Sequence, residues 1–135
     1  MQRKLARENA FILIFESICK KDETAEEIFE KATIIRGLEV DDYVKNVFFG
    51  SYENSLKIEE AMEKHFKGWK KERISPVSMA TLRLGCYEIM FMDDIPSKVS
   101  INEAIEISKK YDDEKSYAFV NGVLNAVAKD YAKND

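Results

Sequence analysis

Apolar side chains recur every three or four residues along most of the chain, which is the period of an amphipathic helix. Residues 3–20 form the first such segment. Its predicted inward face consists of Phe11, Ile14, Phe15 and Ile18. Residues 24–37 form the second, because Thr24-x-x-Glu27 has the spacing of a capping box and Gly37 is a typical terminator. No alternating strand pattern of useful length competes, so the chain is predicted to be all-α.

A third segment begins at Asp41 or Asp42 and carries a broken apolar stripe as far as Phe66. Gly50 and Ser51 interrupt the stripe, and a Gly-Ser pair is a common cause of a helix kink. The sequence therefore predicts a bend or a break at this pair.

The next segment is predicted to be the central helix of the fold. Ser75-Pro76 is a start signal, because a hydroxyl side chain can cap the helix and proline fits its first turn. The helix runs to about Met92 and is apolar nearly all round, which is typical of a buried helix. Glu88 is the exception. An unpaired interior carboxylate would cost several kcal/mol, so Glu88 is predicted to be a structural ion pair or a capping acceptor.

Two more helices are predicted in the C-terminal part. Ser100-x-x-Glu103 has capping-box spacing and opens a helix to about Tyr111. After a polar gap at residues 112–115, a last helix precedes a frayed end at residues 129–135. Its apolar stripe is Phe119, Val120, Val123, Leu124 and Val127. Gly122 lies inside this helix and is expected to permit close packing, because a mid-helix glycine costs ~1 kcal/mol relative to alanine.

Length and composition add a domain count to this picture. The chain has 135 residues, of which 45% are hydrophobic and 34% charged, the balance of a globular rather than a disordered protein. A chain of this length can bury roughly two-thirds of its unfolded surface, so it needs no metal or disulfide to fold. We expect one domain, residues 1–135, built as a bundle of about six or seven helices.

The charges are unevenly distributed. The formal net charge of -4 argues by itself against a nucleic-acid binder, but a phosphate backbone responds to local charge. One group of cations is Arg3, Lys4 and Arg7, with no acid among residues 1–7. A second is Lys64, Lys67, Lys70, Lys71 and Arg73, opposed by Glu72 alone. Residues 39–63 are acidic. The molecule is therefore predicted to be polarised.

Side chains that carry catalysis or hold metals are scarce. His65 is the single histidine and is expected on the surface, with stacking on a nucleic-acid base as the alternative. Cys19 and Cys86 lie in apolar runs without C-x-x-C spacing, so both are expected to be buried thiols in a reducing compartment. No glycine-rich phosphate loop is present. We predict that the chain is not an enzyme and uses no cofactor or metal.

No basic and apolar leader opens the chain, and no apolar run is long enough to cross a bilayer. A cytoplasmic location without membrane contact is therefore expected.

Four blocks of the sequence are more specific. "RKLARENAFILIFE" (residues 3–16) resembles the opening helix of the NusB transcription antitermination family. "WKKERISPVSMATLRLGCYEI" (residues 69–89) is similar to the family's W-x-x-x-R-[LI]-S segment followed by L-R-x-x-x-Y-E. "IPSKVSINEAIEISKKY" (residues 95–111) and "SYAFVNGVLN" (residues 116–125) resemble two further family blocks. The four occur in family order and span nearly the whole chain.

The resemblance implies an all-α fold of two packed helical sub-bundles and a role in antitermination on ribosomal RNA transcripts. It implies binding of boxA-type single-stranded RNA together with NusE, a ribosomal protein that also acts in transcription, and loading onto elongating RNA polymerase. Ile12 and Phe15 stand where the family often has glutamine and tyrosine, which predicts fewer base contacts in this chain.

Three groups of residues are the predicted RNA contacts. Arg3, Lys4 and Arg7 fall at i, i+1 and i+4, so at least the two arginines should share a face near the helix start and meet phosphates. The second group is Lys64, Phe66, Lys67, Lys70 and Lys71, which pairs cations with a ring able to stack on a base. The third is Tyr111, Lys115 and Tyr117, which extend the same surface.

A protein partner is expected at the start of the central helix, where Glu72 and Ser78 are the candidate NusE contacts. Leu13 lies opposite the main apolar face, which leaves it either tolerated on the surface or in a helix contact with a partner or second copy. A homodimer that masks the basic helix is one alternative. A scaffold for transcription or ribosome assembly that does not touch RNA is another. The RNA-recognition half of a methyltransferase is a third, but no methyl-donor-binding domain is expected in residues 1–135.

Overall fold

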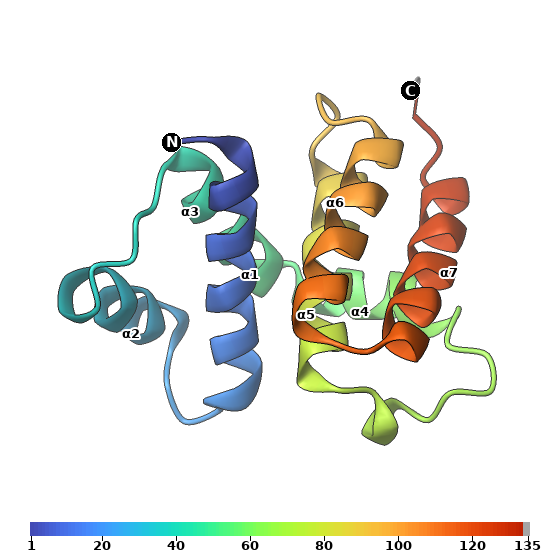
Figure 1. Cartoon of the computed structure of the whole chain (residues 1–135), viewed down its shortest axis with the longest axis horizontal. Coiled ribbons are helices and arrows are strands. Elements are labelled where there is room, and N and C mark those ends of the chain that lie inside the picture. Colours follow the sequence, from blue (N-terminus) through green and yellow to red (C-terminus); the bar gives the residue numbers. More distant parts are fainter. Residues whose placement is uncertain (134–135) are drawn as a thin grey trace.

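The computed structural model describes residues 1–133, and over that range it contains helices and no strands (Figure 1). The α-helices are α1 (Arg3–Cys19), α2 (Ala25–Glu30), α3 (Asp42–Glu53), α4 (Ser55–Glu63), α5 (Pro76–Phe91), α6 (Ser97–Tyr111) and α7 (Glu114–Asp130). A π-helical turn, η1 (Lys31–Ile35), continues α2, and a 3-10 turn, η2 (Lys71–Arg73), precedes α5. The predicted all-α class is confirmed.

The helices form two packed groups that share α5 (Figure 1). In the figure α1, α2 and α3 lie on one side, and α4, α6 and α7 gather with α5 on the other. Both α1 and α3 pack against α5, as do α4, α6 and α7. The prediction of a buried central helix is confirmed, because eleven of the sixteen residues of α5 are buried. One hydrophobic core extends through both groups.

Two predicted helix starts are confirmed in atomic detail. The Thr24 hydroxyl accepts from the Glu27 amide at 3.1 Å, and the Glu27 carboxylate accepts from the Thr24 amide at 2.8 Å, which completes the capping box. The Ser75 hydroxyl accepts from the amide of Ser78 at 3.0 Å, with proline in the first turn of α5. Both caps involve residues three positions apart, so they could be predicted from the sequence without knowledge of the tertiary structure.

The third segment is broken, as predicted, but the break lies at Asn54 and not at the Gly50-Ser51 pair, which lies inside α3. The Asn54 side chain donates to the carbonyl of Gly50 at 2.9 Å and competes with the helical backbone, which separates α3 from α4. Gly50 has a different role. A Cβ built on it would lie 2.3 Å from the hydroxyl oxygen of Tyr87, so the glycine allows α3 to approach α5.

The start of α6 also differs from the prediction. The helix begins at Ser97, directly after Pro96, whose φ of -60° leads the chain into the helix. Ser100 therefore lies inside α6, and its hydroxyl donates to the carboxylate of Glu88 at 2.8 Å instead of capping. Ser100 therefore makes a hydrogen bond to another helix and does not cap the start of α6.

Three side chains have environments that the helical period did not predict. Leu13 is fully buried, because α1 packs against α3 on one side and α5 on the other. Cys19 is exposed at the end of α1, whereas Cys86 is buried as predicted. Gly122 is exposed, and a Cβ added to it would meet no atom within 4 Å. The close approach to α7 occurs instead at Gly85, whose Cβ would meet Leu124 at 2.8 Å.

The C-terminal segment is more ordered than expected. Helix α7 continues to Asp130, and the Lys133 ammonium donates to the carbonyls of Glu88, Met92 and Ile95 at 3.2, 3.1 and 2.7 Å. A cation at this end of α5 interacts favourably with the helix dipole, and it shares the carbonyls of Glu88 and Met92 with the backbone amides of Met92 and Ile95. The rest of the predicted frayed end, residues 134–135, lies outside the described residues.

Candidate nucleic-acid interface

The first turn of α1 presents two cations to solvent. Arg3 and Lys4 are exposed, and no acidic residue occurs in that turn. The Arg3 guanidinium carbon lies 4.3 Å from the ring centroid of Tyr43, a cation-π contact that orients the side chain without neutralising it. The positive charge of these two residues adds to the partial positive charge of the helix N-terminus, which favours an anion.

Arg7 does not belong to this exposed group, and its sequence interpretation as a solvent-facing residue is corrected. Its side chain is only 6% exposed. Its Nε donates to Glu88 Oε2 at 2.7 Å, and its Nη1 lies 3.6 Å from Glu103 Oε1. Arg7 lies one helical turn after Arg3 on α1, and its side chain reaches Glu88 on α5. The two arginines are close along the helix, but only Arg7 is buried. A phosphate cannot reach this guanidinium without breaking a buried ion pair.

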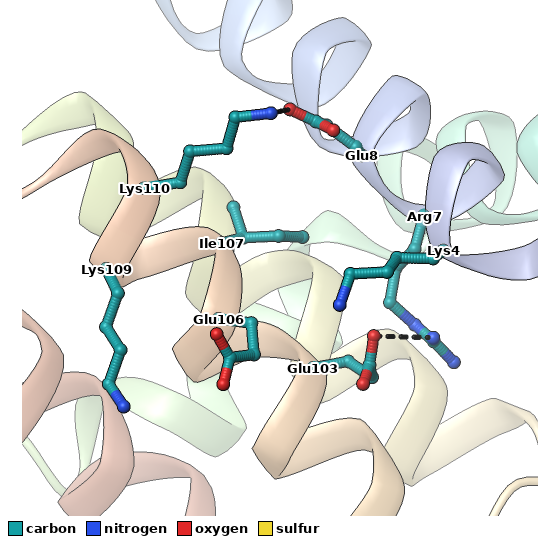
Figure 2. Close-up of a pocket in the computed structure, with 8 residues that line it drawn as sticks. All are labelled: Lys4, Arg7, Glu8, Glu103, Glu106, Ile107, Lys109 and Lys110. Carbon is teal, nitrogen blue, oxygen red and sulfur yellow. Dashed lines mark hydrogen bonds and ion pairs between the residues drawn. The ribbon is translucent and has the colours of Figure 1, made fainter.

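A groove of about 340 Å³ runs between α1 and α6 beside the exposed cations. Figure 2 shows Lys4 reaching into it from α1 and Lys110 standing on α6 across from Glu8. The Lys110 ammonium donates to Glu8 Oε2 at 2.6 Å, and the Tyr111 hydroxyl donates to the same oxygen. These two hydrogen bonds, that of Lys110 first, lower the pKa of Glu8. Tyr111, a predicted contact, is 41% exposed and borders the same region.

The second basic segment divides into two parts. Lys67 and Lys70 are exposed and have no ion-pair partner among residues 1–133. Lys64 instead lies 3.6 Å from Asp130, and Lys71 lies 2.9 Å from Glu63. Asp130 is at the far end of α7 from Lys115, about 22 Å away at 1.5 Å per residue. Lys64 therefore lies apart from Lys115 at the start of α7.

The ring predicted to stack on a base is inaccessible. Phe66 is 6% exposed, and its ring centroid lies 5.5 Å from that of Phe119 in the core. His65, whose surface placement was predicted, is partly exposed and its Nε2 lies 2.7 Å from Asp130 Oδ2. Phe66 therefore offers no free face to a nucleobase, and one ring nitrogen of His65 is already engaged by Asp130.

The remaining predicted residues fall near the start of α7 and of α5. Lys115 is exposed, and Tyr117 is partly buried with the Lys109 ammonium 5.5 Å from its ring centroid. Glu72 is exposed in η2. Ser78 is 2% exposed and its hydroxyl donates to Asp112 Oδ2 at 3.1 Å, so it can support a partner surface but its own side chain is committed inside the fold.

Trp69 and Arg73 are surface residues that were not among the predicted RNA contacts, although Arg73 was counted in the second group of cations. Both are exposed, and the Trp69 ring centroid lies 4.7 Å from that of Phe119. The available signal was the W-x-x-x-R spacing, which was used only for the family resemblance. Within residues 1–133, no group of three or more His, Cys, Asp or Glu side chains is placed to hold a metal, and no helix is long and apolar enough to span a membrane.

Comparison with known proteins gives one consistent family. The NusB family model matches residues 4–129. The transcription antitermination protein NusB of Clostridium botulinum (strain Alaska E43) is 41% identical, covering 96% of this chain and 99% of the relative. That of Bacillus licheniformis is 42% identical, covering 96% and 98%.

Solved structures agree with this result. NusB of T. maritima superposes with a TM-score of 0.85 at 35% identity, covering 98% of this chain and 94% of the other. A chain from a crystal structure of antitermination factors NusB and NusE in complex with dsRNA gives 0.83 at 30% identity, covering 96% and 97%. The chain belongs to the NusB family.

Proposed function

We propose that this protein is a transcription antitermination factor that binds single-stranded boxA-type RNA together with NusE and couples that RNA to elongating RNA polymerase. The family match and the solved NusB–NusE–RNA complex of a relative support the general role. In this chain the observation that carries RNA contact is the exposed Arg3 and Lys4 pair at an acid-free helix N-terminus. A factor with this role acts in the cytoplasm and is not an enzyme; its relatives are named transcription antitermination proteins.

The contact surface that we propose begins at Arg3 and Lys4, follows the groove beside Lys110 and Tyr111, and continues toward Lys115 at the start of α7. Tyr111 joins the two parts, because its hydroxyl reaches Glu8 on α1 while the next residue, Asp112, borders the N-terminus of α5. The family match over residues 4–129 also supports a single domain. Glu72, exposed in η2, remains the proposed NusE contact.

The experiment that tests this function measures binding of a boxA-type RNA to this protein alone, to NusE alone and to the mixture. We expect weak binding by each protein and strong binding by the mixture, because two linked binding surfaces then share one strand. Binding of NusE without any gain in RNA affinity would instead support the scaffold that does not touch RNA.

One of the two arguments for a homodimer no longer applies. Leu13, which was a candidate contact with a second copy, is in the core, so only the family resemblance suggests self-association. We therefore propose that the RNA-binding species is one copy of this chain with one copy of NusE, which light scattering of the mixture measures directly.

A further inference from the structure

A second groove, of about 260 Å³, lies where the segment before α5 meets the N-termini of α5 and α7. Its lining includes an exposed aromatic ring and two exposed cations, contributed by Trp69, Arg73 and Lys115. It is separate from the groove between α1 and α6, with which it shares no lining residue.

The indole of Trp69 is held in place from one side. It packs on Phe119, whose ring in turn contacts Phe66, so the ring rests on the core. The backbone enters through Gly68 at φ +76°, and the Trp69 amide donates to the carbonyl of Phe66 at 2.7 Å. Glycine adopts this left-handed conformation without strain. Yet 46% of Trp69 remains exposed, which leaves a rigid aromatic surface facing the groove.

The charges of the groove favour a stacked base over a free anion. Arg73 and Lys115 have no ion-pair partner among residues 1–133, but Asp112 and Asp113 also line the groove. Two cations and two carboxylates give no net charge, so the cations alone would bind an isolated phosphate weakly, and a stacked base has to supply the larger part of the binding. Both carboxylates already accept hydrogen bonds from groups of this chain. Asp112 Oδ2 accepts from the hydroxyls of Ser75 and Ser78, and Asp113 caps α7 through the amide of Ser116 at 2.8 Å. Backbone hydrogen bonding by Ser116 lowers the pKa of Asp113.

We infer that Trp69, Arg73 and Lys115 form a stacking subsite for one nucleobase of single-stranded RNA, with the phosphates on either side of that nucleotide held by the two cations. The inference rests on the proposed RNA-binding function and names a residue for it. Trp69 takes the place of Phe66 as the ring that stacks, because only Trp69 has a free surface. Stacking on an aromatic ring tolerates any base, and flanking cations supply the backbone contact. Lys67 and Lys70 are exposed on the segment that carries Trp69 and add positive charge next to it in the sequence.

The chain contains one tryptophan, so in titrations of the chain by itself intrinsic tryptophan fluorescence reports on this groove alone, and in mixtures the emission of NusE titrated separately is subtracted. We would titrate the full chain, with and without NusE, with short single-stranded oligoadenylate and with the same strand paired to oligouridylate. Single-stranded RNA should quench the emission, and the duplex, whose bases are already stacked, should not. Quenching that is equal for both probes would overturn the inference.

Variants separate stacking from charge. Trp69→Ala should weaken single-strand binding by about 5- to 100-fold, measured by anisotropy of labelled RNA, while Trp69→Phe should stay close to the parent. Tyr52→Ala removes a similarly exposed ring on the acidic helix α3 and should change nothing. Arg73→Ala and Lys115→Ala keep the fluorophore and should each shift the quenching curve to higher RNA concentration and lower the salt dependence. These two variants test the site even if Trp69→Ala unfolds.

The outcomes distinguish this inference from the proposed function. If Lys4→Ala weakens RNA binding while neither Trp69→Ala nor Lys115→Ala does, RNA binding stands and the stacking subsite is wrong. If no RNA binds with or without NusE, the proposed function itself fails. If NusE alone quenches the emission and Trp69→Ala weakens NusE binding but not RNA binding, the groove is a protein contact and the inference is overturned.

Discussion

The Nε of Arg7 donates to Oε2 of Glu88 at 2.7 Å across the boundary between the two helical groups. The hydroxyls of Tyr43 and Ser100 donate to the same carboxylate, so one side chain on α5 is bonded to α1, α3 and α6. Burial lowers the pKa of Arg7, but the hydrogen bond and charge of Glu88 outweigh it and the net shift is upward. Burial and then the charge of Glu88 raise the pKa of Tyr43, so its hydroxyl remains a donor. The cluster holds the basic end of α1 in a fixed orientation.

Arg7→Ala should lower the free energy of unfolding by about 3–5 kcal/mol, because it leaves the Glu88 carboxylate buried without its cation. Lys4→Ala is the matched control on the same helix and should change stability by no more than about 0.5 kcal/mol. Urea unfolding measures both. An Arg7→Ala variant that keeps its stability and loses RNA affinity would show that Arg7 contacts phosphate after all.

Helix caps could be predicted from the sequence, whereas the burial of side chains that depends on how helices pack could not. Thr24 and Ser75 cap helices within three residues of themselves, so their roles could be read from spacing. Arg7 and Leu13 depend on which way α1 faces α5, and a helical period alone does not contain that information. Glu88 was predictable as a paired carboxylate because burial demands a partner, although its partners are 12 to 81 residues away.

The candidate interface shows the same division. Arg3 and Lys4 were found because charge at a helix start needs only local sequence. Phe66 and Trp69 lie three residues apart in one basic segment, and the sequence does not say which ring turns inward. Packing against Phe119 decides it, since both rings contact Phe119 but only Trp69 keeps an exposed surface.

Two glycines should respond in opposite directions to alanine. Gly50→Ala places a Cβ 2.3 Å from the Tyr87 hydroxyl oxygen and forces the ring to move, which also strains its 2.5 Å hydrogen bond to Asn46. We expect a loss of about 1–3 kcal/mol. Gly122→Ala meets no atom within 4 Å in an exposed helical position and should gain up to about 1 kcal/mol. Thermal unfolding of the two variants beside the parent checks the contrast, and equal shifts would contradict it.

The two cysteines should differ in reactivity. Cys19 is exposed, whereas burial raises the pKa of the Cys86 thiol to about 12. A thiolate is the reactive form, so an aromatic disulfide reagent should modify one thiol per folded chain at neutral pH and the second only on unfolding. In Cys19→Ser the fast reaction should disappear. Rapid modification of both thiols in the native protein would show that the core around Cys86 opens readily.

The contact of Glu8 with Lys110 and Tyr111 should give a pH-dependent contribution to stability. The pKa of Glu8 is lowered from 4.5 in the folded state, so its contribution is present above about pH 4.5 and is lost as the pH falls through the lowered value. Parent and Glu8→Gln should therefore differ in unfolding free energy at neutral pH and converge in acid. Glu26→Gln, an exposed acid in the first turn of α2, is the comparison. A difference in unfolding free energy between parent and Glu8→Gln that grows as the pH falls would contradict this prediction.

The most direct test of the account is the salt dependence of RNA binding by the protein with Arg3 and Lys4 both changed to alanine. Each phosphate contact with a single strand contributes about 0.7 to the slope of log affinity against log salt, so the slope should fall by about 1.4 and affinity should drop at low salt. In the control, Lys45 and Lys57, two exposed lysines of the acidic stretch, are both changed to alanine. This control has the same net charge as the Arg3, Lys4 variant. We predict that the control matches the parent. Equal slopes for the parent and the Arg3, Lys4 variant would contradict the claim that the start of α1 binds the RNA backbone.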